Sequence, residues 1–128
     1  MTPPQKIRRP ARGFRDLTTW QEANALARTA LTLADRMPRG HTFLADQLRR
    51  AATSIPLNIA EGNGKPTRRE YLRFLSIARG SLNEVEAIVE LLRGNPRVPA
   101  TLMDTLLLQL GRTSRLLAAL MQSLHPSP

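Results

Sequence analysis

Hydrophobic residues along the chain recur every three or four positions, which is the period of an α-helix and not of a strand. Four stretches with this pattern are separated by short segments that contain glycine or proline, at 38–40, 62–66 and 94–99. Leucine and alanine dominate the apolar stripes, and both are strong helix formers. The pattern predicts an all-α fold with helices at about 18–37, 42–62, 67–94 and 100–124.

The four expected helices are similar in length, roughly 30 to 40 Å at about 1.5 Å per residue. Short links between such helices favour an antiparallel, up-down-up-down four-helix bundle, which would form one domain over residues 16–125. Two capping boxes support the helix starts, T-W-Q-E at 19–22 and T-R-R-E at 67–70. In each, the threonine is expected to cap the helix while the glutamate reaches back to it.

Pro56 interrupts the second expected helix, within the segment SIPLNIAEGNG at 54–64. Proline has no N–H to donate to the carbonyl of Ala52, and its ring crowds that carbonyl, so we predict a kink at Pro56. Polar residues also recur at helical spacing along this helix, and we call them the polar stripe: Gln47, Arg50, Ser54, Asn58 and Glu61.

The polar stripe has two interpretations. It is either a solvated helix face or a hydrogen-bonding face that contacts another chain. In the second case Ser54 and Asn58 could satisfy carbonyls released around Pro56, and Glu61 would need a basic partner.

The third expected helix carries residues that could contact the polar stripe, in the segment SIARGSLNEVE at 76–86. Gly80 lies in mid-helix, where it indicates either a close approach by another helix or a tolerated exposed glycine. Arg79 could pair with Glu61 or with Glu86. The candidate residues for an oligomer interface or polar network are Gln47, Arg50, Ser54, Asn58, Glu61, Arg79, Ser81, Glu84 and Glu86.

The formal net charge of +9 points towards an acidic partner. More than half of it comes from residues 1–15, which hold five basic residues, no acidic residue and three prolines, so we expect this arm to be disordered. The candidate nucleic-acid-binding residues are Lys6, Arg8, Arg9, Arg12, Arg15, Arg49, Arg50, Lys65, Arg68, Arg69 and Arg73. They would bind phosphates by charge, with little reading of sequence.

Enzymatic chemistry has little support. The two histidines lack metal-ligand spacing, no serine stands in a catalytic pattern, and no phosphate-binding loop motif occurs, so we expect no catalytic site, metal or cofactor. EGNGK at 61–65 is either a helix end or a weak anion loop.

The absence of cysteine and of any apolar run of about 20 residues favours a soluble cytoplasmic protein without a membrane partner.

Two central segments, QLRRAATSIPLNIAEG at 47–62 and EYLRFLSIARGSLNEVEA at 70–87, resemble the family named for proteins encoded in intervening sequences of bacterial 23S ribosomal RNA genes. FRDLTTWQEA at 14–23 is similar to the opening motif of that family, and the resemblance extends from residue 14 to about 122. It implies a small cytosolic bundle that assembles into a homopentameric ring. The accessory variability protein of diversity-generating retroelements looks like a relative, and there the basic pentamer engages nucleic acid.

Two functions therefore stay open. The chain is either a homo-oligomeric, non-enzymatic bundle that binds RNA or DNA weakly and by charge, or a protein scaffold in which the arginines are solvated. The partners expected are further copies of the chain, with RNA, DNA or another protein.

Overall fold

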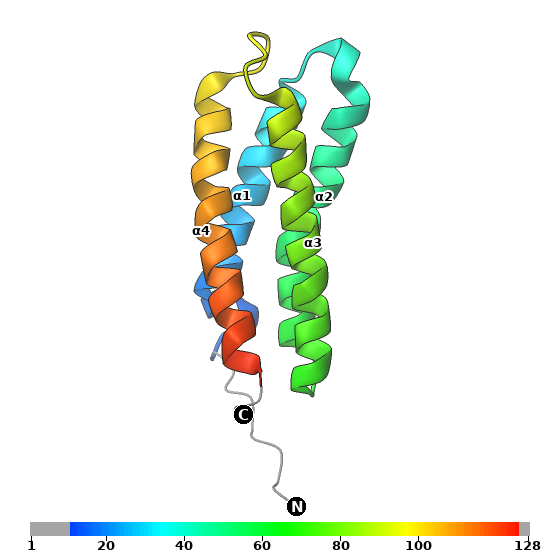
Figure 1. Cartoon of the computed structure of the whole chain (residues 1–128). Helices are drawn as coiled ribbons and strands as arrows, with labels where there is room; N and C mark the ends of the chain where they lie inside the picture. Colours follow the sequence, from blue (N-terminus) through cyan, green and yellow to red (C-terminus); the bar gives the residue numbers. More distant parts are fainter. Residues whose placement is uncertain (1–10, 126–128) are drawn as a thin grey trace, which may run out of the picture.

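The computed structural model describes residues 11–125, and all regular secondary structure within them is helical (Figure 1). The four long helices are α1 Thr18–Asp35, α2 Thr42–Asn63, α3 Arg68–Leu92 and α4 Ala100–Leu124. Two short 3-10 helices, η1 Gly13–Asp16 and η2 Arg39–His41, precede α1 and α2. The expected all-α class with four helices is confirmed.

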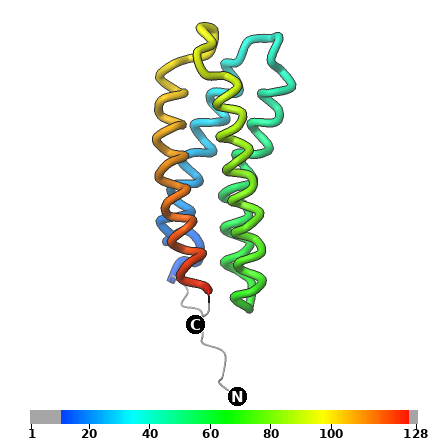
Figure 2. The backbone as a smooth tube through the Cα atoms, in the orientation of Figure 1, coloured from blue at the N-terminus to red at the C-terminus, as the bar shows by residue number. Residues whose placement is uncertain are grey.

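Each long helix packs against two others, since α1 contacts α2 and α4, and α3 also contacts α2 and α4. This is the neighbour pattern of a four-helix bundle. Figures 1 and 2 show the α2–α3 link at one end of the bundle, together with the start of α1 and the end of α4, and we call this the α2–α3 end. The α1–α2 and α3–α4 links lie at the other end, which we call the opposite end.

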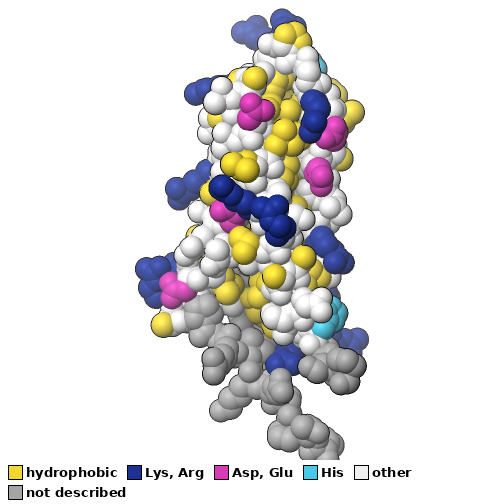
Figure 3. All heavy atoms as spheres, turned by 60° about the vertical axis from the view of Figure 1, so that its left-hand side comes forward, with side chains coloured by type: hydrophobic (Ala, Val, Ile, Leu, Met, Phe, Trp, Pro, Cys, Tyr) yellow, Lys and Arg dark blue, Asp and Glu magenta, His cyan; other side chains and the backbone are white. Residues whose placement is uncertain are grey.

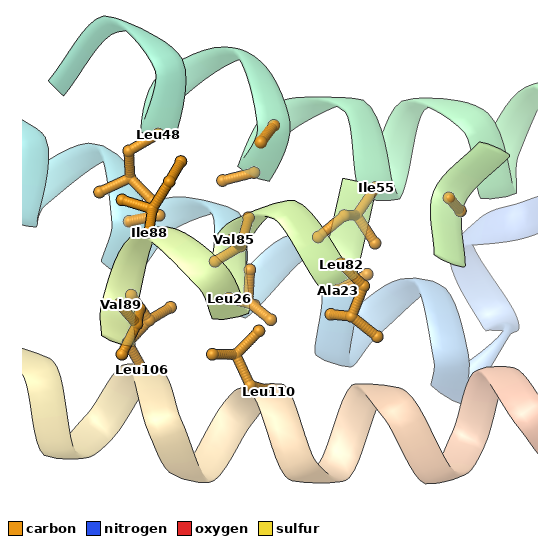
Figure 4. Close-up of a cluster of buried hydrophobic side chains, with 14 of the residues drawn as sticks. Ala23, Leu26, Leu48, Ile55, Leu82, Val85, Ile88, Val89, Leu106 and Leu110 are labelled. Atoms are coloured by element: carbon orange, nitrogen blue, oxygen red, sulfur yellow. The ribbon is translucent and has the colours of Figure 1, made fainter. Parts of the chain in front are cut away.

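The core is built from the apolar stripes of all four helices. In Figure 4 side chains from each helix point toward one another, among them Leu26, Leu48, Val85 and Leu106, which are fully buried. Burying a leucine-sized side chain contributes roughly 1.5–3 kcal/mol, so this cluster supplies the main driving force for packing. The apolar spacing in the sequence thus determines which side of each helix faces inward.

The starts of α1 and α3 differ in how they are capped. Thr67 caps α3 as expected, because its hydroxyl accepts the Glu70 N–H at 3.2 Å. The expected cap at Thr19 is wrong, because the N-cap of α1 is Leu17, two residues earlier, and the helix begins at Thr18. Thr19 is buried instead, and its hydroxyl donates to the Leu116 carbonyl of α4 at 3.4 Å.

Pro56 is buried inside α2, which continues as a helix to Asn63. The neighbouring apolar side chains Ile55 and Ile59 are fully buried as well. Packing on the inner side of α2 therefore offsets the roughly 3 kcal/mol by which an interior proline disfavours a helix. The kink at Pro56 stays a prediction.

The close approach of two helices occurs at Gly62 and not at Gly80, where the sequence pattern had suggested it. A Cβ atom at Gly62 would lie 2.9 Å from the Cβ of Phe74 and 3.2 Å from the carbonyl oxygen of Tyr71, both on α3. A Cβ atom at Gly80 would meet nothing within 4 Å in the described chain. The absence of a side chain at Gly62 thus lets the end of α2 lie directly against the start of α3.

Candidate functional site

The middle of the polar stripe forms a hydrogen-bonded group between α2 and α3. The Asn58 amide Nδ2 donates to the carbonyl oxygen of Ser54 at 2.8 Å and to its Oγ at 2.9 Å. The Ser81 hydroxyl donates to the same Ser54 Oγ at 2.8 Å. All three side chains are half-buried. The Asn58 amide therefore donates to the carbonyl of Ser54 and not to that of Ala52. The Ala52 carbonyl is the one that lacks its usual helical donor, because Pro56 has no N–H.

The ends of the polar stripe are exposed. Glu61, in the last turn of α2, pairs with Lys65 of the following link at 3.6 Å, and not with Arg79. Among the described residues, Arg79 forms no ion pair with either expected partner, Glu61 or Glu86. The remaining predicted members of the polar network are exposed: Gln47, Arg50, Arg79, Glu84 and Glu86. The structure thus joins three of the nine predicted residues directly and leaves the other six on the surface.

Large apolar side chains surround the Ser54–Ser81 hydrogen bond. Leu57 follows Ser54 by three residues and Ile77 precedes Ser81 by four, so each lies one helical turn from that bond on the same side of its helix. We call this surface the α2–α3 face, formed by Phe43, Gln47, Arg50, Ser54, Leu57 and Glu61 with Ile77, Ser81, Glu84 and Leu91. Among the described residues, four of the six exposed large hydrophobic side chains belong to it, namely Phe43, Leu57, Ile77 and Leu91.

The basic arm is described only in part. Lys6, Arg8 and Arg9 lie outside the described residues. Arg12 and Arg15 belong to the segment around η1, which contacts both α1 and α2. Arg12 Nε donates to the Asp16 carboxylate at 2.7 Å, whereas the exposed Arg15 lies over the ring of Phe14. The last residues assigned to the arm thus have a defined fold.

Replacing Arg12 with alanine should raise the pKa of Asp16. The hydrogen bonds from the Arg12 side chain and backbone N–H hold the pKa of that carboxyl below its usual value. A lowered folded-state pKa means that the pair stabilises the fold above the ordinary pKa and loses this effect as the pH falls through the lowered one. An NMR titration of the Asp16 carboxyl carbon would measure the change; an identical midpoint in both proteins would contradict the pairing.

Four predicted basic residues gather at the α2–α3 end. Lys65, Arg68, Arg69 and Arg73 lie in the link or in the first two turns of α3. Lys65 Nζ and Arg73 Cζ lie 5.0 and 4.7 Å from the centre of the Phe74 ring. Arg69 and Arg73 are exposed. The same end of the bundle carries the start of α1, so Arg12 and Arg15 lie at it too (Figure 1).

Arg49 and Arg50 lie away from this end. Arg50 precedes Lys65 by fifteen residues along α2 and its link, which corresponds to about 22 Å of helix. Arg49 Nη2 pairs with Asp35 of α1 at 3.0 Å, and its Nη1 pairs with Asp46 at 2.8 Å. The hydrogen bond to Asp35 raises the pKa of Arg49 and both carboxylates compensate its charge. Arg49 thus links α1 to α2.

Further basic residues were not among the predicted nucleic-acid-binding residues, because they are scattered along the sequence. The two links at the opposite end carry Arg36, Arg39, Arg93 and Arg97, of which Arg93 pairs with Glu90 at 3.0 Å. The α3–α4 link also borders an open pocket of about 590 Å³. On α4, Arg112 and Arg115 line a smaller hollow of about 230 Å³ with Glu22. Figure 3 shows basic side chains spread over the whole height of one side of the molecule.

The segment EGNGK does not form an anion loop around both glycines. Gly62 is buried within α2 against α3, and Gly64 is the C-cap whose N–H donates to the Glu61 carbonyl at 3.1 Å. Within residues 11–125, no three histidine, aspartate or glutamate side chains lie close enough together to hold a metal ion. No helix in this part of the chain combines the length and apolar character needed to cross a membrane.

These observations define the protein as a four-helix bundle with a mixed polar and apolar face along α2 and α3 and basic residues at the end where those helices meet. A family model described as 23S rRNA-intervening sequence protein matches residues 15–119. The chain therefore belongs to the family of 23S rRNA-intervening sequence proteins, as its motifs indicated. No curated protein matches the chain.

Proposed function

We propose that this protein is a non-enzymatic, homo-oligomeric bundle that binds nucleic acid by charge, with little sequence preference. Its copies associate through the α2–α3 face, and its α2–α3 end contacts phosphates. The bundle is antiparallel, up-down-up-down, with α2 bent at Pro56. The pentameric ring and the cytoplasmic location are part of the proposal and come from the family resemblance.

The observation that carries the nucleic-acid proposal is the composition of the α2–α3 end. Six described basic residues lie there, namely Arg12, Arg15, Lys65, Arg68, Arg69 and Arg73. Within residues 12–16 and 61–73, which hold these six, the acidic residues are Asp16, Glu61 and Glu70, so the excess is three positive charges before Lys6, Arg8 and Arg9 are counted. In a ring, each copy would repeat this end, and several weak phosphate contacts would act together.

The oligomer proposal depends on the α2–α3 face. Phe43, Leu57 and Leu91 are 64, 66 and 72% exposed, although side chains of this size are usually buried. They alternate with residues of both charges, Arg50, Glu61 and Glu84. An apolar surface crossed by complementary charges is typical of contacts between protein chains. The half-buried Ser54 group would then lie at the centre of the contact.

A protein scaffold without nucleic acid is the second candidate. It is favoured by the ion pairs that already compensate some of the basic residues, Arg12 with Asp16 and Lys65 with Glu61. In that case the α2–α3 face would be the functional surface and the basic end would be solvated.

Binding to a mixed RNA pool should weaken steeply as the salt concentration rises, because each phosphate contact releases a counterion. The variant with Arg69→Ala and Arg73→Ala should bind more weakly, with a salt slope shallower by about two units if each arginine makes one contact. Fluorescence anisotropy of labelled RNA across a salt series would measure both. The absence of binding at low salt would exclude the nucleic-acid proposal and favour the scaffold.

A matched control loses the same charge at the opposite end. The variant with Arg39→Ala and Arg97→Ala removes two exposed arginines from the other links. It should keep the salt slope of the unmodified protein. Equal loss in both double variants would show that binding follows net charge, and the α2–α3 end would then have no special role.

A further inference from the structure

A cluster of aromatic and basic side chains lies at the α2–α3 end, next to the basic residues considered so far. The rings of Phe14 and Trp20 lie 4.9 Å apart between centroids, tilted by 59°. The guanidinium carbon of Arg15 lies 4.7 Å from the centre of the Phe14 ring. Phe14 and Trp20 are half-buried residues that keep some exposed surface, although Trp20 also packs against the core, and Arg15 is exposed.

The backbone holds this cluster in place. The Leu17 N–H donates to the Phe14 carbonyl at 3.0 Å, and the Gln21 side chain donates to the Arg15 carbonyl at 2.8 Å. The segment packs on both α1 and α2 through η1. Little order has to be imposed on the rings when a ligand binds, because they are already positioned.

Aromatic side chains are scarce and unevenly distributed in this chain, which has only five. Tyr71 is buried, and Phe43 lies at the start of α2, near the opposite end. The other three, Phe14, Trp20 and Phe74, lie at the α2–α3 end, and basic side chains stack on both phenylalanines. Aromatic rings and surface cations thus meet where phosphates are proposed to bind.

We propose that Phe14 and Trp20 form a stacking site for unpaired bases, so that the ligand is single-stranded nucleic acid. This inference rests on the proposed function. A base would take the place of the Arg15 guanidinium on Phe14, and the guanidinium would turn to the adjacent phosphate. Bases in a duplex are stacked on each other and cannot reach these rings, whereas duplex phosphates can still contact Arg69 and Arg73.

Trp20 reports on this site directly, because it is the only tryptophan of the chain. Its emission would be recorded while the intact protein is titrated with an unlabelled single-stranded RNA of about 12 nucleotides, then with the same sequence as a duplex. Anisotropy of the labelled strands would follow binding in parallel. The single strand should quench Trp20 in step with binding, and the duplex should bind with the emission nearly unchanged.

Two substitutions at one position provide the control. Phe14→Leu keeps an apolar side chain but removes the ring face, and it should weaken single-strand binding about fivefold or more while leaving duplex binding unchanged. Phe14→Tyr keeps a ring and should bind like the unmodified protein. Circular dichroism melting would show that both variants fold; if Phe14→Leu did not, Trp20 quenching in the Phe14→Tyr protein would still test the site.

The outcomes separate this inference from the proposed function. If RNA raises the anisotropy but leaves Trp20 emission unchanged, or if duplex and single strand quench equally, the stacking site is wrong and charge-driven binding stands. If neither strand form binds at low salt, both proposals fail.

Discussion

Replacing Gly62 with alanine is expected to lower the free energy of unfolding by about 1–3 kcal/mol, although alanine is the better helix former. The added Cβ would lie 2.9 Å from the Cβ of Phe74 and 3.2 Å from the backbone oxygen of Tyr71. Neither atom belongs to the end of a flexible side chain, so α2 and α3 would have to move apart. The midpoint of thermal unfolding would fall by several degrees, and the midpoint of urea unfolding would move to a lower concentration.

Gly80→Ala is the matched control, because this glycine also lies inside a long helix. A Cβ atom there meets nothing within 4 Å in the described chain. This substitution should therefore raise the free energy of unfolding by up to about 1 kcal/mol through helix propensity. Unchanged or increased stability of Gly62→Ala, measured beside Gly80→Ala, would contradict the close contact between α2 and α3.

The two glycines also show what the sequence can predict about this fold. Periodicity places residues on a face of their own helix, and this was enough to find the four helices and the inward stripes. It does not say which residue of one helix lies beside which residue of the next. Gly80 looked like the contact point because it interrupts a long helix, whereas Gly62 looked like a helix end because two glycines and a proline follow Glu61 within five residues.

The same reasoning explains how much of the candidate site could be predicted from the sequence. Helical spacing correctly put Ser54 and Asn58 on one side of α2, but their partner Ser81 could not be chosen from spacing alone. Arg49 and Arg50 follow one another in sequence, yet adjacent residues of a helix point about 100° apart. Arg49 therefore faces Asp35 of α1, and Arg50 lies on the α2–α3 face.

A carboxylate introduced at Leu57, on the α2–α3 face, should break the assembly. Leu57→Glu would place a carboxylate in the centre of the proposed contact, where burial without a partner costs several kcal/mol per contact. Leu57 is 66% exposed in the single chain, so the substitution should change the stability of the bundle by no more than about 0.5 kcal/mol. Light scattering should give a multiple of 14.3 kDa for the unmodified protein and 14.3 kDa for Leu57→Glu.

Leu108→Glu separates this effect from a general effect of added charge. Leu108 is 56% exposed on α4 and lies outside the α2–α3 face, so the substitution adds the same carboxylate at a similarly exposed leucine. The variant should keep the mass of the unmodified protein. Because all contacts in a closed ring are equivalent, one substitution per chain acts at every contact, and a partial loss of mass is not expected. An unmodified chain that is monomeric at micromolar concentration, or a Leu57→Glu protein that retains the oligomer mass, would show that this face does not join copies.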